Sequence, residues 1–154
     1  MNALDATDRA ILRELQADGR LANVELAGRV HLSESACLRR VRLLEERGYV
    51  ERYTLLVNPS AVGLAGTVFA EITLTSQKQR ELAAFEQAVR AVPEVMECYL
   101  ITGEYDYLLR LVVRDNLDYE RIHREHLTKL PGVARVKSSF ALRTVAKKTD
   151  LPLG

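Results

Sequence analysis

The first 48 residues place apolar side chains at the spacing of three short helices. The pattern predicts helices over residues 5–18, from Asn23 onward, and from Ser33 to about Arg47, with Asp5, Asn23 and Ser33 as N-caps. A tight connection separates the second helix from the third. This arrangement is typical of the helix-turn-helix, whose last helix lies in the DNA major groove. We expect one small core built from Ile11, Leu12, Leu15, Val24, Leu26, Ala27, Val30, Cys37, Val41 and Leu44.

The third predicted helix also has a polar side. Ser35, Arg39 and Arg42 follow the spacing i, i+4, i+7 opposite the apolar positions, and Arg40 lies to one side. A guanidinium can donate two hydrogen bonds to guanine or fork onto a phosphate, so these residue types suit contact with DNA. An exposed arginine-rich face can equally be an ordinary solvated surface, and the pattern alone leaves both interpretations open.

The pattern changes after Gly48. Apolar and aromatic residues between Tyr49 and Val57 predict a short strand or hairpin, and residues 58–66, which contain a proline and two glycines, interrupt it. We therefore divide the chain into a helix-turn-helix domain over residues 1–57, a linker over 58–66 and a second domain over 67–154.

The second domain alternates between strand and helix periods. Its predicted elements are a strand over 68–74, a helix over 77–91, strands over 95–101 and 107–113, a helix over 116–129 and a strand over 133–145. This βαββαβ order is that of the ferredoxin-like fold, in which both helices lie on one face of an antiparallel sheet. The chain as a whole is therefore of the α+β class. We expect the helix residues facing the sheet to be Leu82, Phe85, Val89, Leu117, Ile122, His126 and Leu130.

The predicted strands carry apolar residues on both faces, for example Leu108 beside Leu109 and Val112 beside Val113. The helices can cover only one face of the sheet, so the other face needs a cover of its own, commonly a second copy of the domain. The sequence therefore predicts a dimer.

The charge balance limits where DNA could bind. The chain has 22 Lys plus Arg against 21 Asp plus Glu, and this net charge of +1 excludes a uniformly basic nucleic-acid coat. Residues 1–58 hold nine arginines and nine acidic residues, so a DNA-binding surface has to be local. We expect the DNA-binding surface at the three arginines of the third helix. The acidic residues Asp5, Asp8 and Glu14 belong to another predicted helix.

Membrane, targeting and redox signals are absent from the sequence. No apolar run approaches the ~18 residues of a membrane span, and the first residues lack the pattern of a signal peptide. Cys37 and Cys98 lie far apart and form neither a disulfide framework nor a zinc motif. We expect a cytoplasmic protein with reduced thiols and no membrane partner.

Motifs for catalysis or metal binding are sparse. The chain has no phosphate-binding glycine loop and no nucleophile elbow, and Glu120 with His123 is only half of a di-iron motif. Glu104 and Asp106 flank Tyr105 in a predicted turn, where they could share one side of a pocket or simply be solvated. We expect no enzyme, no metal and no cofactor.

Several runs of the sequence together resemble the Lrp/AsnC family, the leucine-responsive and "feast/famine" transcription regulators. The runs are 21–27, 32–45, 97–109, 130–133 and 138–142, and they include a Gly103-Glu104-Tyr105-Asp106 turn similar to the family's Gly-Asp-x-Asp-Tyr hallmark. The resemblance spans essentially the whole chain in order. It implies a winged-helix-like DNA-binding domain followed by a RAM, or ACT-like, domain that carries dimerisation and amino-acid sensing.

The resemblance also implies partners and site residues. The partners would be double-stranded DNA, further copies of the chain as a dimer that assembles to an octamer, and a free amino acid. Residues at the DNA would be Ser33, Ser35, Leu38, Arg39, Arg40 and Arg42. Residues at the effector, between RAM domains, would be Tyr99, Thr102, Gly103, Glu104, Tyr105, Asp106, Ser138 and Ser139.

The implied effector site has a physical basis in this sequence. Asp106 or Glu104 could accept hydrogen bonds from the ammonium group of an amino acid, and backbone amides around Gly103 could bind its carboxylate. The wording of residues 93–99 and 149–153 looks closest to regulators that answer to leucine, methionine or similar amino acids. Haem-pathway decarboxylases share the architecture and are the enzyme alternative.

Two positions depart from the pattern that the resemblance implies. Glu104 replaces the commoner aspartate, which lengthens one side chain of the effector turn. Glu34 and Ala36 stand where many members have prolines near the start of the third helix, which alters the entry into that helix.

Overall fold

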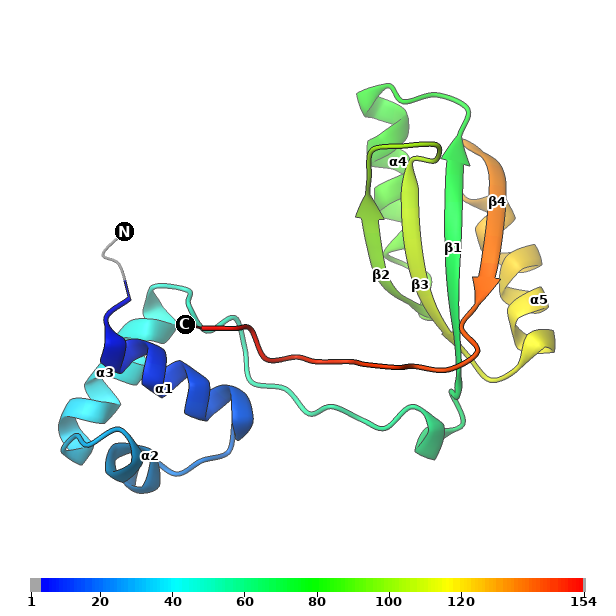
Figure 1. The fold of residues 1–154 in the computed structure, drawn as a ribbon. Helices are drawn as coiled ribbons and strands as arrows, with labels where there is room; N and C mark the ends of the chain where they lie inside the picture. The colour runs from blue at the N-terminus through cyan, green and yellow to red at the C-terminus, as the bar shows by residue number, and fades with distance from the viewer. Residues whose placement is uncertain (1–3, 154) are drawn as a thin grey trace. The chain divides into compact units, whose positions relative to one another are not determined.

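The computed structural model describes residues 4–153, which form two compact units (Figure 1). One unit holds the chain up to Leu56 together with the segment from Val145 onward, and the other is Val57–Thr144. The sequence pattern places residues 145–153 in the second domain, but in the structure they group with the N-terminal helices. The contacts responsible include hydrogen bonds between the side chains of Arg13 and Gln16 and the backbone of Leu151 and Leu153, and such bonds leave no periodicity in the sequence.

Three helices form the N-terminal unit: α1 (Ala6–Ala17), α2 (Asn23–Arg29) and α3 (Glu34–Glu46). Two predicted caps are confirmed, because Asp5 accepts a hydrogen bond from the amide of Asp8 (2.7 Å) and Ser33 accepts one from the amide of Ala36 (3.3 Å). Asn23 is not a cap. It is the first residue of α2, and its side-chain amide donates to the carbonyl of Glu34 (3.0 Å), which ties α2 to the start of α3.

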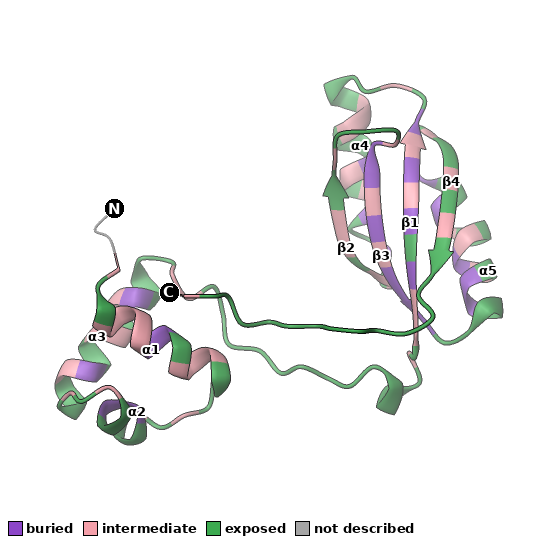
Figure 2. Cartoon of the chain, in the orientation of Figure 1, coloured by how far each residue is buried: buried purple, intermediate pink, exposed green. Residues whose placement is uncertain are grey.

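The core of this unit is built from the apolar sides of all three helices (Figure 2). Ile11 and Cys37 are completely buried, and Leu26 and Leu44 are nearly so. The predicted apolar sides are confirmed except at Val24, which is 57% exposed. Val24 lies in the first turn of a helix of only two turns, where its neighbours cannot cover it.

The segment that follows α3 does not form the predicted strand or hairpin. Residues 49–57 carry no strand assignment, and Tyr53 to Val57 are exposed. The hydroxyl of Tyr53 donates to Glu45 of α3 (2.9 Å), which holds the segment against the helix at this point. A strand needs hydrogen-bonding partners, and the part of the chain that the structure describes places no second strand beside this segment.

The second unit has the predicted βαββαβ order. Its strands are β1 (Gly66–Leu74), β2 (Val95–Leu100), β3 (Tyr107–Val113) and β4 (Val133–Phe140), joined by helices α4 (Gln79–Val89) and α5 (Asn116–Glu125) and by the short 3-10 helices η1 (Ser60–Val62) and η2 (Leu127–Lys129). All pairs are antiparallel, in the order β2-β3-β1-β4. The first strand begins inside the predicted linker, and the last ends at Phe140 rather than near residue 145.

Both helices of this unit lie on one face of the sheet (Figure 1). Alternate residues of β1 and β3 point to that face, and Phe85 and Ile122 of the helices are completely buried against them. Leu117 was expected to face the sheet but is 76% exposed. The side chain of the next residue, Asp118, turns inward instead. The buried strand residues are Val68, Ala70, Ile72, Leu74, Tyr107, Leu109, Leu111 and Val113.

The opposite face of the sheet has no helix over it within Val57–Thr144. We call it the open face. Its residues follow from the register, since directly paired residues share a face. It combines exposed apolar side chains with two ion pairs, Arg110 to Glu97 (2.6 Å) and Lys137 to Glu71 (3.1 Å). The open face consists of Thr67, Phe69, Glu71, Thr73, Glu97, Tyr99, Leu108, Arg110, Val112, Arg135, Lys137 and Ser139.

Gly66 lies where the chain enters the sheet and pairs with Val113 of β3. A Cβ at this position would lie 2.6 Å from a methyl carbon of Val113 and 3.0 Å from its carbonyl oxygen. No side chain fits there without displacing β3, so the close approach of the two strands requires glycine.

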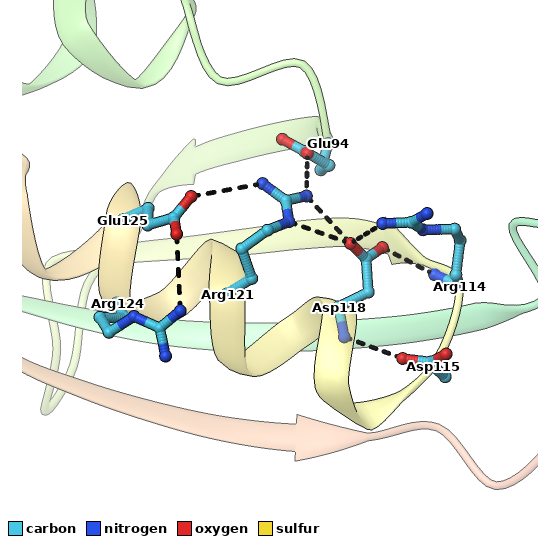
Figure 3. A network of polar contacts seen from close by, with 7 residues as sticks. All are labelled: Glu94, Arg114, Asp115, Asp118, Arg121, Arg124 and Glu125. Atoms are coloured by element: carbon cyan, nitrogen blue, oxygen red, sulfur yellow. Dashed lines mark hydrogen bonds and ion pairs between the residues drawn. The ribbon is translucent and has the colours of Figure 1, made fainter.

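A charge cluster fixes the start of α5 (Figure 3). The buried carboxylate of Asp118 accepts hydrogen bonds from the guanidinium (2.9 Å) and the backbone amide (3.0 Å) of Arg114, and from the guanidinium of Arg121 (2.9 Å). Arg121 also donates to Glu94 (2.9 Å), the residue before β2. The donors, Arg114 above all, hold the pKa of Asp118 well below its usual range. The cluster ties α5 to the start of β2.

Candidate functional site

The outer side of α3 has the features of a DNA-binding surface. Ser35, Arg39 and Arg42 are exposed, and Leu38 between them is 40% exposed. Neither Arg39 nor Arg42 forms an ion pair with any residue between 4 and 153. Two guanidinium groups on one exposed helix face, without an ion pair to the described residues, can donate to base edges or to phosphates.

Ser33 and Arg40 lie at the margin of this surface with other partners. The hydroxyl of Ser33 caps α3 and lies 3.4 Å from that of Ser35. Arg40 reaches back to α1, where its guanidinium donates to Asp5 (2.8 Å) and Asp8 (2.7 Å). Asp5 and Asp8, two of the three acids expected on another helix, therefore neutralise one of the three arginines. The positively charged surface of α3 is therefore smaller than the sequence suggests and is centred on Arg39 and Arg42.

The turn between β2 and β3 is open to solvent at its tip. Thr102, Gly103 and Glu104 are exposed, and Tyr105 is half-buried. Gly103 has a φ of +135°, which side-chain-bearing residues rarely adopt, and its position leaves free space where a Cβ would be. The backbone at the tip is therefore accessible to a ligand.

Asp106, at the other end of this turn, is buried and fully engaged. Its carboxylate accepts hydrogen bonds from the amide of Leu74 (2.7 Å) and from the side chain of Gln77 (2.6 Å). Its own amide donates to Ile72 (2.8 Å). Asp106 thus fastens the turn to the end of β1, and it does not present its carboxylate to solvent together with Glu104.

Gln77 is a site residue that the sequence analysis missed. It lies in the connection between β1 and α4, far from the turn in sequence, and it occupies one oxygen of Asp106. A glutamine in a polar connection carries no periodic signal, so only the three-dimensional structure pairs it with Asp106.

The two serines of β4 lie on opposite faces of the sheet. Ser138 pairs with Ala70 on the helix-covered face and hydrogen-bonds the hydroxyl of Tyr119, whereas Ser139 lies on the open face. β1 separates β4 from β3, so neither serine meets the turn within one chain. Tyr99 also lies on the open face, where its hydroxyl donates to Glu97 (3.1 Å).

The cysteines and the acidic residues were compared with the requirements of reactive thiols and metal ligands. Burial raises the pKa of the Cys37 thiol, and burial together with the charge of Glu86 raises that of Cys98 to about 11, so both thiols stay protonated at neutral pH. Among residues 4–153, no three His, Cys, Asp or Glu side chains come together as metal ligands would. No helix in the described part of the chain is long and apolar enough to cross a membrane.

Comparison with known proteins connects both units to one family. A model described as the Lrp/AsnC ligand binding domain matches residues 67–151, and one described as winged helix-turn-helix DNA-binding matches residues 4–51. The Leucine-responsive regulatory proteins of Escherichia coli (strain K12) and Klebsiella pneumoniae are each 42% identical over 148 residues. These matches cover 96% of this chain and 90% of each relative.

Solved structures agree with the sequence relatives. A transcriptional regulator from Neisseria meningitidis, in complex with L-methionine, has a TM-score of 0.93 at 40% identity over 98% of this chain and 97% of its own. A feast or famine regulatory protein from M. tuberculosis, also complexed with L-methionine, has a TM-score of 0.87 at 36% identity over 97% and 99%.

The matched relatives are named as regulators, so the comparisons lend nothing to the decarboxylase alternative. Both domains match in order, and the alignment with these regulators spans nearly the whole chain. The chain belongs to the Lrp/AsnC family of DNA-binding transcriptional regulators.

Proposed function

We propose that the chain binds operator DNA through the exposed side of α3, with Ser35, Leu38, Arg39 and Arg42 at the DNA. The observation that carries this proposal is that Arg39 and Arg42, exposed on the last helix of a helix-turn-helix, form no ion pair within residues 4–153. In our proposal Ser33 supports this surface by capping α3. Two such N-terminal units in a dimer would engage half-sites about one DNA turn apart. We place this activity in the cytoplasm.

The test of this surface is a double variant, Arg39→Ala with Arg42→Ala. We expect at least a tenfold loss of affinity (about 1–3 kcal/mol per good contact) for DNA fragments selected by the wild-type chain. The salt dependence of binding should also become weaker, because fewer phosphate contacts are made. Arg80→Ala on the exposed side of α4 is the matched control, since it removes the same charge from the other unit. Unchanged affinity of a folded double variant would exclude this surface.

We further propose that the turn from Thr102 to Asp106 binds a free amino acid. Glu104 is the accessible carboxylate for the ammonium group, and the exposed backbone at Gly103 is suited to the carboxylate. Asp106 and Gln77 hold the turn in place. Tyr99 and Ser139 are exposed on the open face, and we assign them to the contact with a neighbouring copy. We expect leucine, methionine or a similar apolar amino acid, because relatives carry the name leucine-responsive or are solved with L-methionine.

Calorimetry with L-leucine, L-methionine and L-aspartate tests the effector, with light scattering to follow assembly size. We expect heat and a change in assembly with the two apolar amino acids and neither with L-aspartate. A ligand can change assembly only when it binds one assembly more tightly than another. No heat with any of the three, at a concentration where the chain binds DNA, would remove the proposed sensing role.

The open face is the proposed dimer interface. It carries the exposed apolar side chains of Phe69 and Tyr99 together with charged residues, and no helix of Val57–Thr144 covers it, so a second copy of the chain is a suitable cover. Dimers formed in this way would leave the β2–β3 turns available for contact between dimers, and we propose assembly to an octamer.

A further inference from the structure

The last described residues of the chain are bound to the outer side of α1. Gln16 makes two reciprocal hydrogen bonds with the backbone of Leu151: its side-chain oxygen accepts from the Leu151 amide (2.8 Å), and its side-chain nitrogen donates to the Leu151 carbonyl (3.2 Å). Arg13, one turn earlier, donates to the carbonyl of Leu153 (3.2 Å). All three bonds are made to backbone groups of the segment and none to its side chains.

An apolar contact accompanies the hydrogen bonds. Leu153 is partly buried and packs against the same core cluster as Ile11 and Leu44, whereas residues 141–150 are exposed. Leu142 and Val145 are among the most exposed apolar residues of the chain. The segment is therefore held at its end, at Leu151–Leu153, and not along its course.

We call the unit that contains α1, α2 and α3 the head, and the unit Val57–Thr144 the sheet unit. The attachment changes how the head is connected to the sheet unit. The chain leaves the head after Leu56 and returns to it at Val145, so the head is joined to the sheet unit by two segments when Leu151–Leu153 is bound. When the segment is released, only the connection after Leu56 remains. A second connection removes orientations that an otherwise singly tethered head would sample, and this lowers the entropy lost when the head binds DNA.

We infer that the Arg13–Gln16 side of α1 is a docking surface for the chain's own segment 150–153, and that this docking pre-orients the head and strengthens operator binding. The partner it fits is an extended peptide that offers a paired amide and carbonyl to Gln16 and an apolar side chain to the head core.

Trypsin tests the docking at Lys147 and Lys148, which lie four and three residues before Leu151. These side chains are exposed, but a protease binds several residues on both sides of the bond it cuts, so cleavage there requires release of the docked Leu151–Leu153. We expect Gln16→Ala to accelerate cleavage at Lys147 and Lys148 about tenfold, since it removes two hydrogen bonds of ordinary strength. Gln87→Ala, at an exposed glutamine of α4, is the matched control and should leave the rate unchanged. Leu153→Asp is a second route, because it places a charge against the apolar cluster. Equal rates for the wild type and both docking variants would overturn the docking.

Affinity for a DNA fragment selected by the wild-type chain tests the functional half. We expect Gln16→Ala to weaken binding about three- to tenfold with an unchanged salt slope, because no charge is altered. Unchanged affinity, despite faster cleavage, would overturn the pre-orientation. A reduced salt slope would overturn it as well, because it would mean that Lys147 and Lys148 contact phosphates directly. The cleavage assay uses no DNA, so a failure of docking and a failure of DNA binding are told apart.

Discussion

At the scale of single residues, the two acids of the β2–β3 turn have different surroundings. Asp106 is 6% exposed and accepts two hydrogen bonds through its carboxylate, whereas Glu104 is exposed at the tip. Their spacing in the sequence is that of side chains on one side of an extended segment. The turn does not stay extended, because Gly103 adopts a positive φ and Asp106 is drawn to the amide of Leu74.

Asp106→Asn and Glu104→Gln should separate these roles. Asn keeps one carbonyl oxygen for the Leu74 amide, and the Gln77 side chain has to rotate so that its own oxygen accepts from the new NH2 group. Two hydrogen bonds to a charged carboxylate thereby become bonds between neutral groups, which are weaker. We expect Asp106→Asn to lower the free energy of unfolding by about 1–3 kcal/mol. Glu104→Gln should change it by less than about 0.5 kcal/mol but weaken amino-acid binding. Urea unfolding and calorimetry measure the two effects. Equal destabilisation by both variants would contradict the distinction.

Asp118 makes stability depend on pH. Its pKa is lower in the folded chain than in an unfolded one, because the guanidinium and amide of Arg114 and the guanidinium of Arg121 favour the charged form. The stabilisation is therefore present above the unfolded pKa of about 4 and is lost as the pH falls toward the folded value.

We expect Asp118→Asn to cost about 1–2 kcal/mol at pH 7, allowing for the solvent exposure of Arg114. The difference from the wild type should shrink as the pH falls from about 5 to 3. Urea unfolding of both chains across this range checks it. A difference that stays constant with pH would mean that the charge of Asp118 is not responsible.

At the scale of elements, the sequence predicts those features that depend on contacts between residues close together in the chain. Asp5 and Ser33 cap their helices as predicted because a cap involves neighbours in the chain. The ion pairs of Arg40 with Asp5 and Asp8 join two helices more than 30 residues apart, and nothing periodic links their positions. The strand predicted after Gly48 does not form for a related reason. Whether a segment becomes a strand depends on a neighbouring strand, and the sequence of the segment alone does not show whether one is present.

The pairing of α3 with α1 predicts opposite effects for two adjacent arginines. Arg40→Ala leaves Asp5 and Asp8 without their shared cation and should destabilise the head by about 0.5–1.5 kcal/mol, with little effect on DNA affinity. Arg39→Ala should weaken DNA binding and leave stability nearly unchanged. Urea unfolding and DNA titration at one salt concentration compare the two. If Arg40→Ala alone reduced affinity as much as Arg39→Ala, Arg40 would itself be a DNA contact.

At the scale of the whole molecule, two separate hydrophobic cores support the two proposed functional surfaces. The head core holds the helices that present α3, and the sheet core holds the β2–β3 turn and the open face. The fold of each unit could be predicted from periodicity, because each is organised around its own apolar pattern. The grouping of residues 145–153 with the head could not, because Gln16 recognises their backbone.

Assembly should depend on the open face and not on exposed apolar residues in general. Phe69 on β1 is 38% exposed at the open face, and Leu117 is 76% exposed on the outside of α5. We expect Phe69→Asp to dissociate dimers because it buries an unpaired charge in the proposed interface, while Leu117→Asp leaves assembly intact. Light scattering after size-exclusion chromatography measures the mass. Dimers that survive Phe69→Asp would place the interface elsewhere.

The close approach at Gly66 also bears on how relatives of this chain can diverge. A side chain at position 66 meets both a methyl carbon and the carbonyl of Val113, so shrinking Val113 relieves only part of the conflict. In an alignment of family members, a residue larger than glycine at position 66 should therefore occur only with a smaller residue at position 113 and a shift of the strand pair. The two positions should vary together, although more than 40 residues separate them.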